Sequence, residues 1–322
     1  MTTIQIQSAL EAAIRAPSPH NTQPWRFEST ADRVDVFLDE SRILPVADPD
    51  GREARMSCAA ALFNLRMTLR LQGLPARLKL LPDPARPELL ARVKTSGRLA
   101  ATADERCLAE AIPRRRTNRR PFDSRAVPSA VQTTLQQAAL REGCRLVLVD
   151  QPVRYGALAN LLRSAEFTQR EDAGFQEELS RWLAGDPERH DGIPPFASGP
   201  PPLQEPLILL RQYGENAAKA PRDFEQEPLL AVLVTRNDTV HDHLRAGQAM
   251  QRVLLAATAC GLDTSFLSAA VELPASRSAL RELLGNEGHP QVVLRLGYGH
   301  PASATNRRPV REVNTCVQTS RT

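Results

Sequence analysis

Residues 16–27 read APSPHNTQPWRF, and this stretch decides much of the fold. It follows a helical pattern and contains the aromatic residue Trp25. Its prolines stiffen the backbone, and its polar residues carry hydrogen-bonding side chains: Ser18, His20, Asn21 and Gln23. A stiff loop holds such groups in place at a low entropic cost. The stretch is therefore typical of a binding loop rather than of a plain connection.

Outside this loop, the spacing of apolar residues predicts an α+β chain. The expected helices span residues 3–15, 51–72, 103–112, 129–143, 150–185, 241–260 and 274–285. The expected strands span residues 33–39, 74–81, 88–93, 145–149, 228–235 and 291–299. The stretch from Asp186 to Leu207 is too rich in proline for a helix or a central strand. So long an irregular segment indicates either a disordered linker or a functional cover.

The order of elements repeats along the chain. Two long helical patterns, residues 50–74 and 243–262, both end in Gly-Leu, and each follows a strand pattern. Chance repetition of helix and strand is one explanation. The simpler explanation is a duplicated unit whose two copies pack as a dimer within one chain. We therefore expect a first half, residues 1–112, and a second half, residues 113–322.

The composition excludes several classes of protein. The 322 residues are 42% hydrophobic and 24% charged, which is typical of a globular rather than a disordered chain. The N-terminus does not have the pattern of a signal peptide, and no run of about 18 apolar residues predicts a membrane-spanning helix. Five cysteines without a CxxC pair disfavour zinc sites and disulfide frameworks. We expect a cytoplasmic protein without a bound metal and without a membrane partner.

Arginines gather in two short runs. Residues 113–122 read PRRRTNRRPF and residues 306–311 read NRRPVR, while the formal net charge of the chain is only +4. Guanidinium groups present planar sets of donors that suit phosphate oxygens. The two runs could clamp one terminal phosphate, form a nucleic-acid face, or be a solvated basic linker.

Taken together, these motifs resemble a known family. APSPHNTQPWRF resembles the PS-x-x-N-x-QPW signature of the FMN-dependent nitroreductases, and RRRTNRRPF resembles that family's Arg-Arg-Ser-x-Arg-x-Phe opening. QVVLRLGYG and NRRPVREV are similar to its closing strand and C-terminal phosphate clamp. Over nearly its full length the chain resembles the two-domain, fused (Acg-like) subgroup. The resemblance implies a nitroreductase-like α+β fold, with two fused copies forming an intramolecular pseudo-dimer and a lid insertion at about residues 165–207.

The resemblance also implies an FMN site at the interface of the two halves. The positions that match the family's phosphate ligands are Arg116, Asn118, Arg120, Arg307 and Arg308. The positions that border and hydrogen-bond the flavin ring are Pro17, Ser18, Pro19, Asn21 and Gln23. A backbone N–H of Ser268 or Ala269 is expected to reach flavin N5. The aromatic residues of the lid, which are candidates for stacking near the ring, are Phe175, Trp182 and Phe196.

The implied activity is hydride transfer from NAD(P)H through FMN to a nitroaromatic, quinone or similar small-molecule acceptor, without a catalytic side chain. The first half has no arginine motif before its first helix, and the second half has no PS-x-x-N motif at residues 139–149. We therefore expect one FMN per chain and a monomer. A closed lid leaves open a flavin-sequestering or regulatory protein with little turnover. A second alternative is a basic nucleic-acid-binding protein, which would be colourless and bind DNA in a salt-sensitive way.

Overall fold

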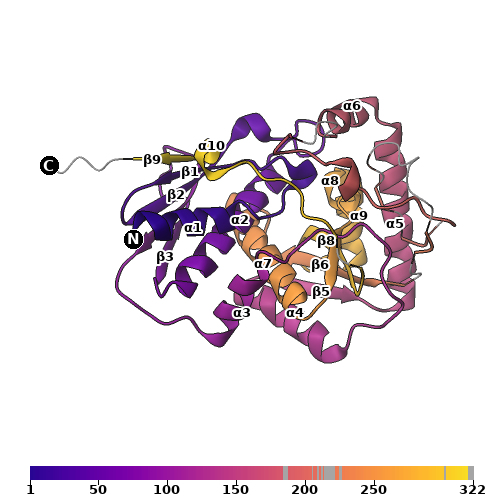
Figure 1. Ribbon diagram of the computed structural model, residues 1–322. Coiled ribbons are helices and arrows are strands. Elements are labelled where there is room, and N and C mark those ends of the chain that lie inside the picture. The colour runs from indigo at the N-terminus through magenta and orange to yellow at the C-terminus, as the bar shows by residue number, and fades with distance from the viewer. Residues whose placement is uncertain are drawn as a thin grey trace.

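The protein folds as two sheets with a pair of long helices between them. This architecture is seen in a computed structural model, which describes residues 1–183, 188–204, 206–208, 210–211, 213, 222–224, 227–300 and 302–317. The central helices are α2 (Arg52–Leu71) and α7 (Val240–Ala259). In Figure 1 the first sheet lies to the left of this pair and the second sheet to the right. The predicted α+β class is confirmed.

The helices and strands follow the predicted order in both halves. The first half contains α1 (Thr3–Ala13), β1 (Trp25–Ser29), β2 (Arg33–Leu38), α2, β3 (Ala76–Leu80), β4 (Leu89–Thr95) and α3 (Ala103–Ala111). The second half contains α4 (Ser129–Arg141), β5 (Arg145–Val149), α5 (Pro152–Glu171), α6 (Ala173–Arg181), β6 (Leu229–Thr235), α7, β7 (Asp263–Phe266), α8 (Ala269–Glu272), α9 (Pro274–Leu283), β8 (His289–Gly297), α10 (Val310–Val313) and β9 (Asn314–Cys316). Short 3₁₀ turns occur at Pro19–Asn21, Glu40–Arg42 and Pro195–Ala197.

The two sheets share one topology. The first has the order β3-β4-β2-β1, and the second has the order β7-β8-β6-β5, with every neighbouring pair antiparallel. The register shifts between Val36 and Phe37 in the first sheet and between Leu233 and Val234 in the second. This is the arrangement that a duplicated unit would produce. The boundary between residues 112 and 113 stays a prediction.

The C-terminal tail crosses back to the first half. Strand β9 pairs in parallel with β1, with Asn314 opposite Phe27, and becomes the edge of the first sheet (Figure 1). The tail therefore carries residues 302–313 past both halves, which places the second arginine run next to the loop that follows α1.

The contact between α2 and α7 is close enough to require a glycine. A Cβ on Gly247 would lie 2.2 Å from the carbonyl oxygen of Met56, far inside van der Waals contact. The side chains around this crossing are buried and come from both halves, including Leu62, Phe63 and Leu254. Burial of each such side chain contributes roughly 1.5–3 kcal/mol. The two halves therefore share one hydrophobic core.

One predicted helix is divided in two. The periodicity predicts a continuous helix over residues 150–185, but α5 ends at Glu171 and Asp172 has extended backbone angles. The Asp172 side chain accepts a hydrogen bond from the Phe175 N–H at 3.0 Å and so caps α6. No proline marks this break, and Gly174 lies within the first turn of α6 rather than at Asp172. Residues 184–187 and 205, which belong to the predicted lid, lie outside the described residues.

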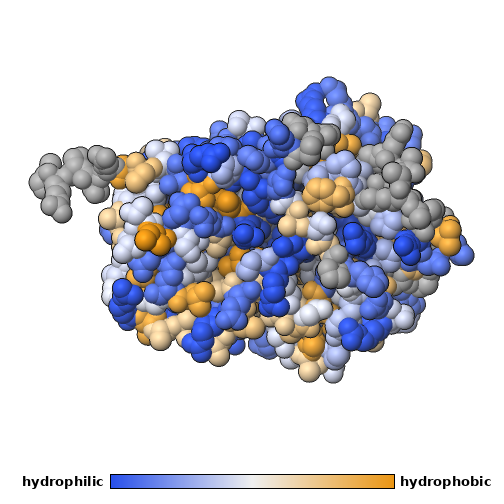
Figure 2. All heavy atoms as spheres, viewed as in Figure 1, coloured by the Kyte–Doolittle hydropathy of each residue, from blue (hydrophilic) through white to orange (hydrophobic). Residues whose placement is uncertain are grey.

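The described surface has few large apolar groups. Figure 2 shows that the face seen in Figure 1 is mostly hydrophilic, with apolar side chains scattered over it. Within the described ranges no helix has the length and apolar character that crossing a membrane requires, and no group of three acidic, histidine or cysteine side chains is arranged to hold a metal ion. All five cysteines are unpaired.

Candidate active site

A cavity of about 390 Å³ lies between the two halves. Its walls come from the end of α1, the loop at residues 17–21, the start of α2, the first arginine run, residues 266–272, β8 and the tail at residues 303–307. Both arginine runs and the proline-rich loop, which are far apart in the sequence, thus meet at one place. Among the residues proposed from the sequence, the following line the cavity: Pro17, Ser18, Pro19, Asn21, Arg116, Ser268 and Arg307.

The proline-rich loop is held in a strained conformation. His20, Asn21 and Gln23 have φ angles of 48°, 59° and 53°, in the left-handed region that glycine normally occupies. Backbone strain of this kind persists only where the surroundings enforce it. Here the hydroxyl of Ser18 accepts a hydrogen bond from the Gln23 N–H at 2.9 Å, which closes the loop. The sequence stretch therefore forms a rigid wall of the cavity.

Two amides of this loop bind backbone carbonyls. Asn21 donates to the carbonyl of Gly192 at 3.0 Å and to that of Asn306 at 3.1 Å. Gln23 donates to the carbonyl of His190 at 2.8 Å and does not line the cavity. The loop thus anchors residues 188–204, which we call the cover segment, together with the C-terminal tail.

The cover segment closes one side of the cavity. It contributes Ile193 to the cavity wall. Asp191 accepts two hydrogen bonds from Arg42, both at 2.9 Å. Trp182 lies near the guanidinium groups of Arg42 and Arg189, at 5.8 and 5.5 Å from its ring centre, so its contacts are with arginine. Of the other aromatic candidates, Phe175 is buried and Phe196 is 47% exposed.

The first arginine run lies along the cavity wall, and several of its side chains line the cavity. Thr117 forms a bridge with Thr264 of β7, and the lining residues of the run are Arg115, Arg116, Thr117 and Arg119. Asn118 faces the protein instead: it donates to the carbonyl of His300 at 2.8 Å and accepts from the N–H of Arg120 at 3.0 Å. Sequence reasoning named Asn118 and Arg120 and missed Arg115, Thr117 and Arg119. No local spacing singles them out, because Arg115, Arg116 and Thr117 are consecutive in the sequence and all line the cavity.

Among the described residues, a group of arginines at the cavity has no carboxylate partner. We call it the arginine cluster, and it consists of Arg15, Arg115, Arg116 and Arg307. Burial and the neighbouring cations lower the pKa of Arg115 to about 9 and that of Arg307 to about 10. Across the described ranges, no carboxylate lies within ion-pair distance of either, and the Nε atoms of both are buried without a hydrogen-bond partner. Such a cluster is arranged to receive an anion.

The remaining proposed residues lie outside the cavity wall. Arg308 turns toward Glu312, with Nε 3.7 Å from Oε2, and donates to the Glu312 carbonyl at 3.3 Å. Ala269 is fully buried beside Ser268 at the start of α8. Arg307, rather than Arg308, is therefore the tail arginine that faces the cavity.

A second set of lining residues is acidic and contains a histidine. We call it the acid–histidine cluster, and it consists of His20, Glu53, Arg211 and Glu272. Arg211 binds Glu272 at 2.7 Å, and this cation, working against burial, lowers the pKa of the Glu272 carboxyl. Burial, with a smaller effect of Arg211, lowers the pKa of His20 to about 3. Burial also raises the pKa of Glu53 to about 8, although Arg52 opposes the shift.

Sequence reasoning assigned no role to the acid–histidine cluster. His20 lies in the quoted loop, but no family position marked it. Glu53, Arg211 and Glu272 come from separate elements and carry no local motif. Only their burial around one cavity identifies them.

Comparison with known proteins agrees with the motifs. Residues 112–298 match the model of the nitroreductase family. A Mycobacterium tuberculosis protein named "Putative NAD(P)H nitroreductase acg" is 32% identical over 97% of this chain and 96% of its own length. A second protein of that organism, "Uncharacterized protein Rv3127", is 33% identical over 98% of this chain and 94% of its own length.

A solved nitroreductase with bound FMN from Bacteroides fragilis is 14% identical, with a TM-score of 0.39 over 62% of this chain and 92% of that one. The family model covers more than half of this chain, and the mycobacterial relatives cover nearly all of it. The chain belongs to the nitroreductase family.

Proposed function

We propose that the chain binds one FMN in this cavity and passes hydride from NAD(P)H to a nitroaromatic, quinone or similar acceptor. The observation that carries this proposal is the arginine cluster. Arg115 is buried and Arg307 is partly buried, and neither has a carboxylate partner among the described residues, an arrangement that is unfavourable unless an anion completes it.

The residues present fit a flavin mononucleotide. The phosphate would be held by Arg115, Arg116 and Arg307, whose guanidinium groups supply charge-assisted donors. The strained loop at residues 17–21 and Ser268 would border the ring, as the family resemblance implies. Arg119 also lines the cavity, while its Nη1 donates to the carbonyl of Ala197 at 3.1 Å.

The bound flavin would supply the hydride chemistry, so the protein needs to bind, orient and exclude water. The loop at residues 17–23 provides rigid orientation, because its backbone is closed by Ser18. The cover segment limits access of water, with Ile193 in the cavity wall.

A second candidate is a protein that holds flavin with little or no turnover. It is favoured by the contacts of the cover segment, since Asn21, Gln23 and Arg119 all donate to its backbone carbonyls. A cover held by three such contacts would slow the exchange of acceptors.

Absorbance spectroscopy tests these candidates. The purified protein should be yellow, with an FMN-to-protein ratio near one, and anaerobic NAD(P)H should bleach the colour rapidly. Persistent colour favours the sequestering protein, and a ratio near two refutes a single site. A colourless protein with salt-sensitive DNA affinity would support a nucleic-acid binder, although Arg115 is only 5% exposed and poorly placed for that role.

A further inference from the structure

We propose that Arg52 is a positioning residue of the flavin site, which fixes the cavity wall at residues 268–272 against the first half of the chain. This inference rests on the proposed function, because that wall is expected to border the flavin ring. It goes further by giving a role to a residue that carries no local motif and does not line the cavity.

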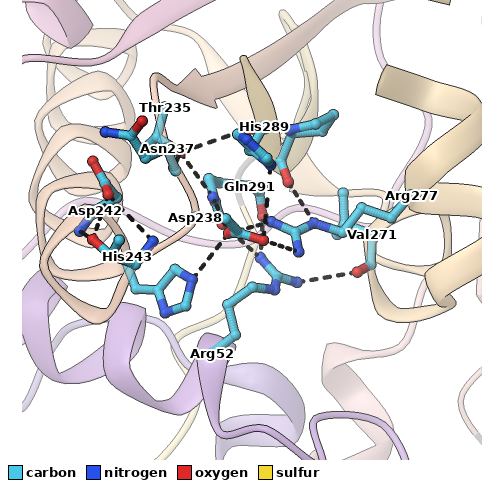
Figure 3. A network of polar contacts seen from close by, with 12 residues as sticks. Arg52, Thr235, Asn237, Asp238, Asp242, His243, Val271, Arg277, His289 and Gln291 are labelled. Carbon is cyan, nitrogen blue, oxygen red and sulfur yellow. Dashed lines mark hydrogen bonds and ion pairs between the residues drawn. The ribbon is translucent and has the colours of Figure 1, made fainter. Parts of the chain in front are cut away.

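Arg52 is a buried arginine whose hydrogen-bond partners line the cavity. Its side chain is 8% exposed. Nη1 donates to the carbonyl oxygen of Gln291 at 2.8 Å and to Oε1 of the same residue at 3.2 Å. Nη2 donates to Oε1 of Glu53 at 2.8 Å and to the carbonyl oxygen of Val271 at 3.2 Å. Figure 3 shows Arg52 reaching both Gln291 and Val271. One guanidinium therefore holds three residues of the wall from outside the cavity.

The contacts of Arg52 join the two halves. Arg52 is the first residue of α2, and this turn is fixed in the first half because Asp48 accepts a hydrogen bond from the Glu53 N–H at 2.9 Å. Gln291 belongs to β8 and Val271 to α8, both in the second half. The guanidinium therefore sets the position of α8 relative to the start of α2.

The wall at residues 268–272 is one tight turn. The carbonyl oxygen of Ser268 accepts hydrogen bonds from the N–H of Val271 at 2.8 Å and from that of Glu272 at 3.0 Å. Ser268 lines the cavity, and its N–H or that of Ala269 is the donor expected at flavin N5. A shift of Val271 would therefore shift this donor. Because donors fixed beside the ring favour its reduced form, the position of the turn should affect the reduction potential.

The side-chain amide of Gln291 is held in one orientation. Its Nε2 donates to Asp238 at 2.9 Å and to the hydroxyl of Thr235 at 2.8 Å, and its Oε1 accepts from Arg52. A carboxylate only accepts and a guanidinium only donates, so the reverse orientation would lose both contacts. Asp238 is itself fixed by the two Nη atoms of Arg277, each at 2.7 Å (Figure 3). Gln291 therefore always presents an acceptor to Arg52.

Substitution of Arg52 tests this role. Arg52→Met removes the guanidinium and keeps an apolar chain. In the flavin-free protein, hydrogen–deuterium exchange of the amides at residues 269–272 should become about tenfold faster, because the Val271 carbonyl loses a charged donor. In the flavin-loaded protein, the reduction potential should move toward that of free FMN. The FMN dissociation constant should stay within about threefold of that of the unaltered protein, since the arginine cluster is unchanged.

Three further variants serve as controls. Arg281→Met is the matched control, because Arg281 also donates to a backbone carbonyl, that of Gly288 at 3.1 Å, but lies outside the cavity wall. Arg52→Lys keeps a cationic donor and should restore part of both effects. Arg52→Met leaves the Glu53 carboxyl without its cation, so the double variant with Glu53→Gln, measured against Glu53→Gln alone, repeats the comparison without that charge.

Faster exchange and a shifted potential in Arg52→Met, with neither change in Arg281→Met, support the inference. Unchanged exchange, or faster exchange with an unchanged potential, overturns it, since Arg52 would then only stabilise the fold. Equal changes in Arg281→Met overturn it as well. Absence of FMN binding by the unaltered protein overturns the proposed function instead.

Discussion

Arginines gather in two places where the halves meet, and their surroundings differ. At the cavity, Arg115 and Arg307 have no carboxylate partner among the described residues. Beside α3 and α4, each arginine is paired: Arg66 with Glu142 at 3.2 Å, Arg252 with Glu142 and with Asp104 at 3.0 Å, and Arg141 with Asp104 at 2.7 Å. We call this second group the ion-pair cluster, and it consists of Arg66, Asp104, Arg141, Glu142 and Arg252.

The difference indicates which side binds a ligand. Paired arginines satisfy their charges within the protein, whereas unpaired buried arginines need an external anion. The proline-rich loop follows α1 in the first half, and Glu142 follows α4 in the second half. If the halves are duplicates, Glu142 lies where the counterpart of the proline-rich loop would be. This is the physical basis for proposing one FMN per chain.

The largest effect should follow from removing a cation at the cavity. Arg115→Met or Arg307→Met should weaken FMN binding about 100-fold, because charge-assisted hydrogen bonds contribute roughly 1.5–3 kcal/mol each. The flavin-free variants should be as stable as the unaltered protein or more so, since an unpaired buried charge is lost. Quenching of FMN fluorescence measures the dissociation constant, and urea unfolding measures the stability.

Arg252→Met provides the matched control from the ion-pair cluster. The FMN dissociation constant of this variant should stay within about threefold of that of the unaltered protein, because Arg252 lies outside the cavity wall. If it weakens FMN as strongly as Arg115→Met does, the two groups of arginines do not differ in function.

The same Arg252→Met variant should lose stability. Without the guanidinium of Arg252, Glu142 keeps Arg66 as a partner and Asp104 keeps Arg141. We therefore expect the free energy of unfolding to fall by about 2 kcal/mol. This is less than the loss for a buried carboxylate that keeps no partner. Urea unfolding of the flavin-free protein measures this. A loss of equal size in Arg115→Met would contradict the contrast between paired and unpaired arginines.

Inorganic phosphate should stabilise the flavin-free protein through the arginine cluster. An anion that binds only the folded state at ten times its dissociation constant contributes about 1.4 kcal/mol, which raises the unfolding temperature by a few degrees. Thermal unfolding in phosphate and in chloride of equal ionic strength measures the shift. The shift should vanish in Arg307→Met and persist in Arg252→Met; a shift that persists in both would place the anion elsewhere.

The sequence predicted most of the helices and strands because their apolar spacing is local. It did not predict β1 and β9, which are short and depend on pairing between residues far apart, such as Phe27 with Asn314. The break at Asp172 was missed because an aspartate cap, unlike glycine or proline, is common within helical patterns.

Part of the candidate site was predicted because its motifs are local in the sequence. Local motifs placed Asn21, Arg116 and Arg307 around one ligand, and all three line the cavity. Glu53 and Glu272 could not be assigned, since no motif links residues that only the folded chain brings together. Their burial, and the charges around them, are properties of the tertiary structure.

The smallest effect should be a pH dependence of the free energy of unfolding that comes from an arginine with a carboxylate partner. Arg70 binds Glu105 at 2.8 Å, and its hydrogen bonds lower the pKa of Glu105 from 4.5 to about 2, against an opposing effect of burial. A carboxyl with a depressed pKa stabilises the fold above its unfolded pKa, and this contribution is lost as the pH falls from about 4.5 toward 2. Because solvent screens the pair, we expect about 1 kcal/mol. Glu105→Gln should therefore be less stable than the unaltered protein at pH 6, and the difference should shrink as the pH falls toward about 2. Glu110→Gln, an exposed position on the same helix, should show no such difference, and urea unfolding across this pH range measures both variants.

The arginine cluster contributes nothing to this acid transition, since the pKa values of Arg115 and Arg307 are about 9 and 10. An equal acid dependence in Arg115→Met and Glu105→Gln would mean that the cavity arginines also have carboxylate partners.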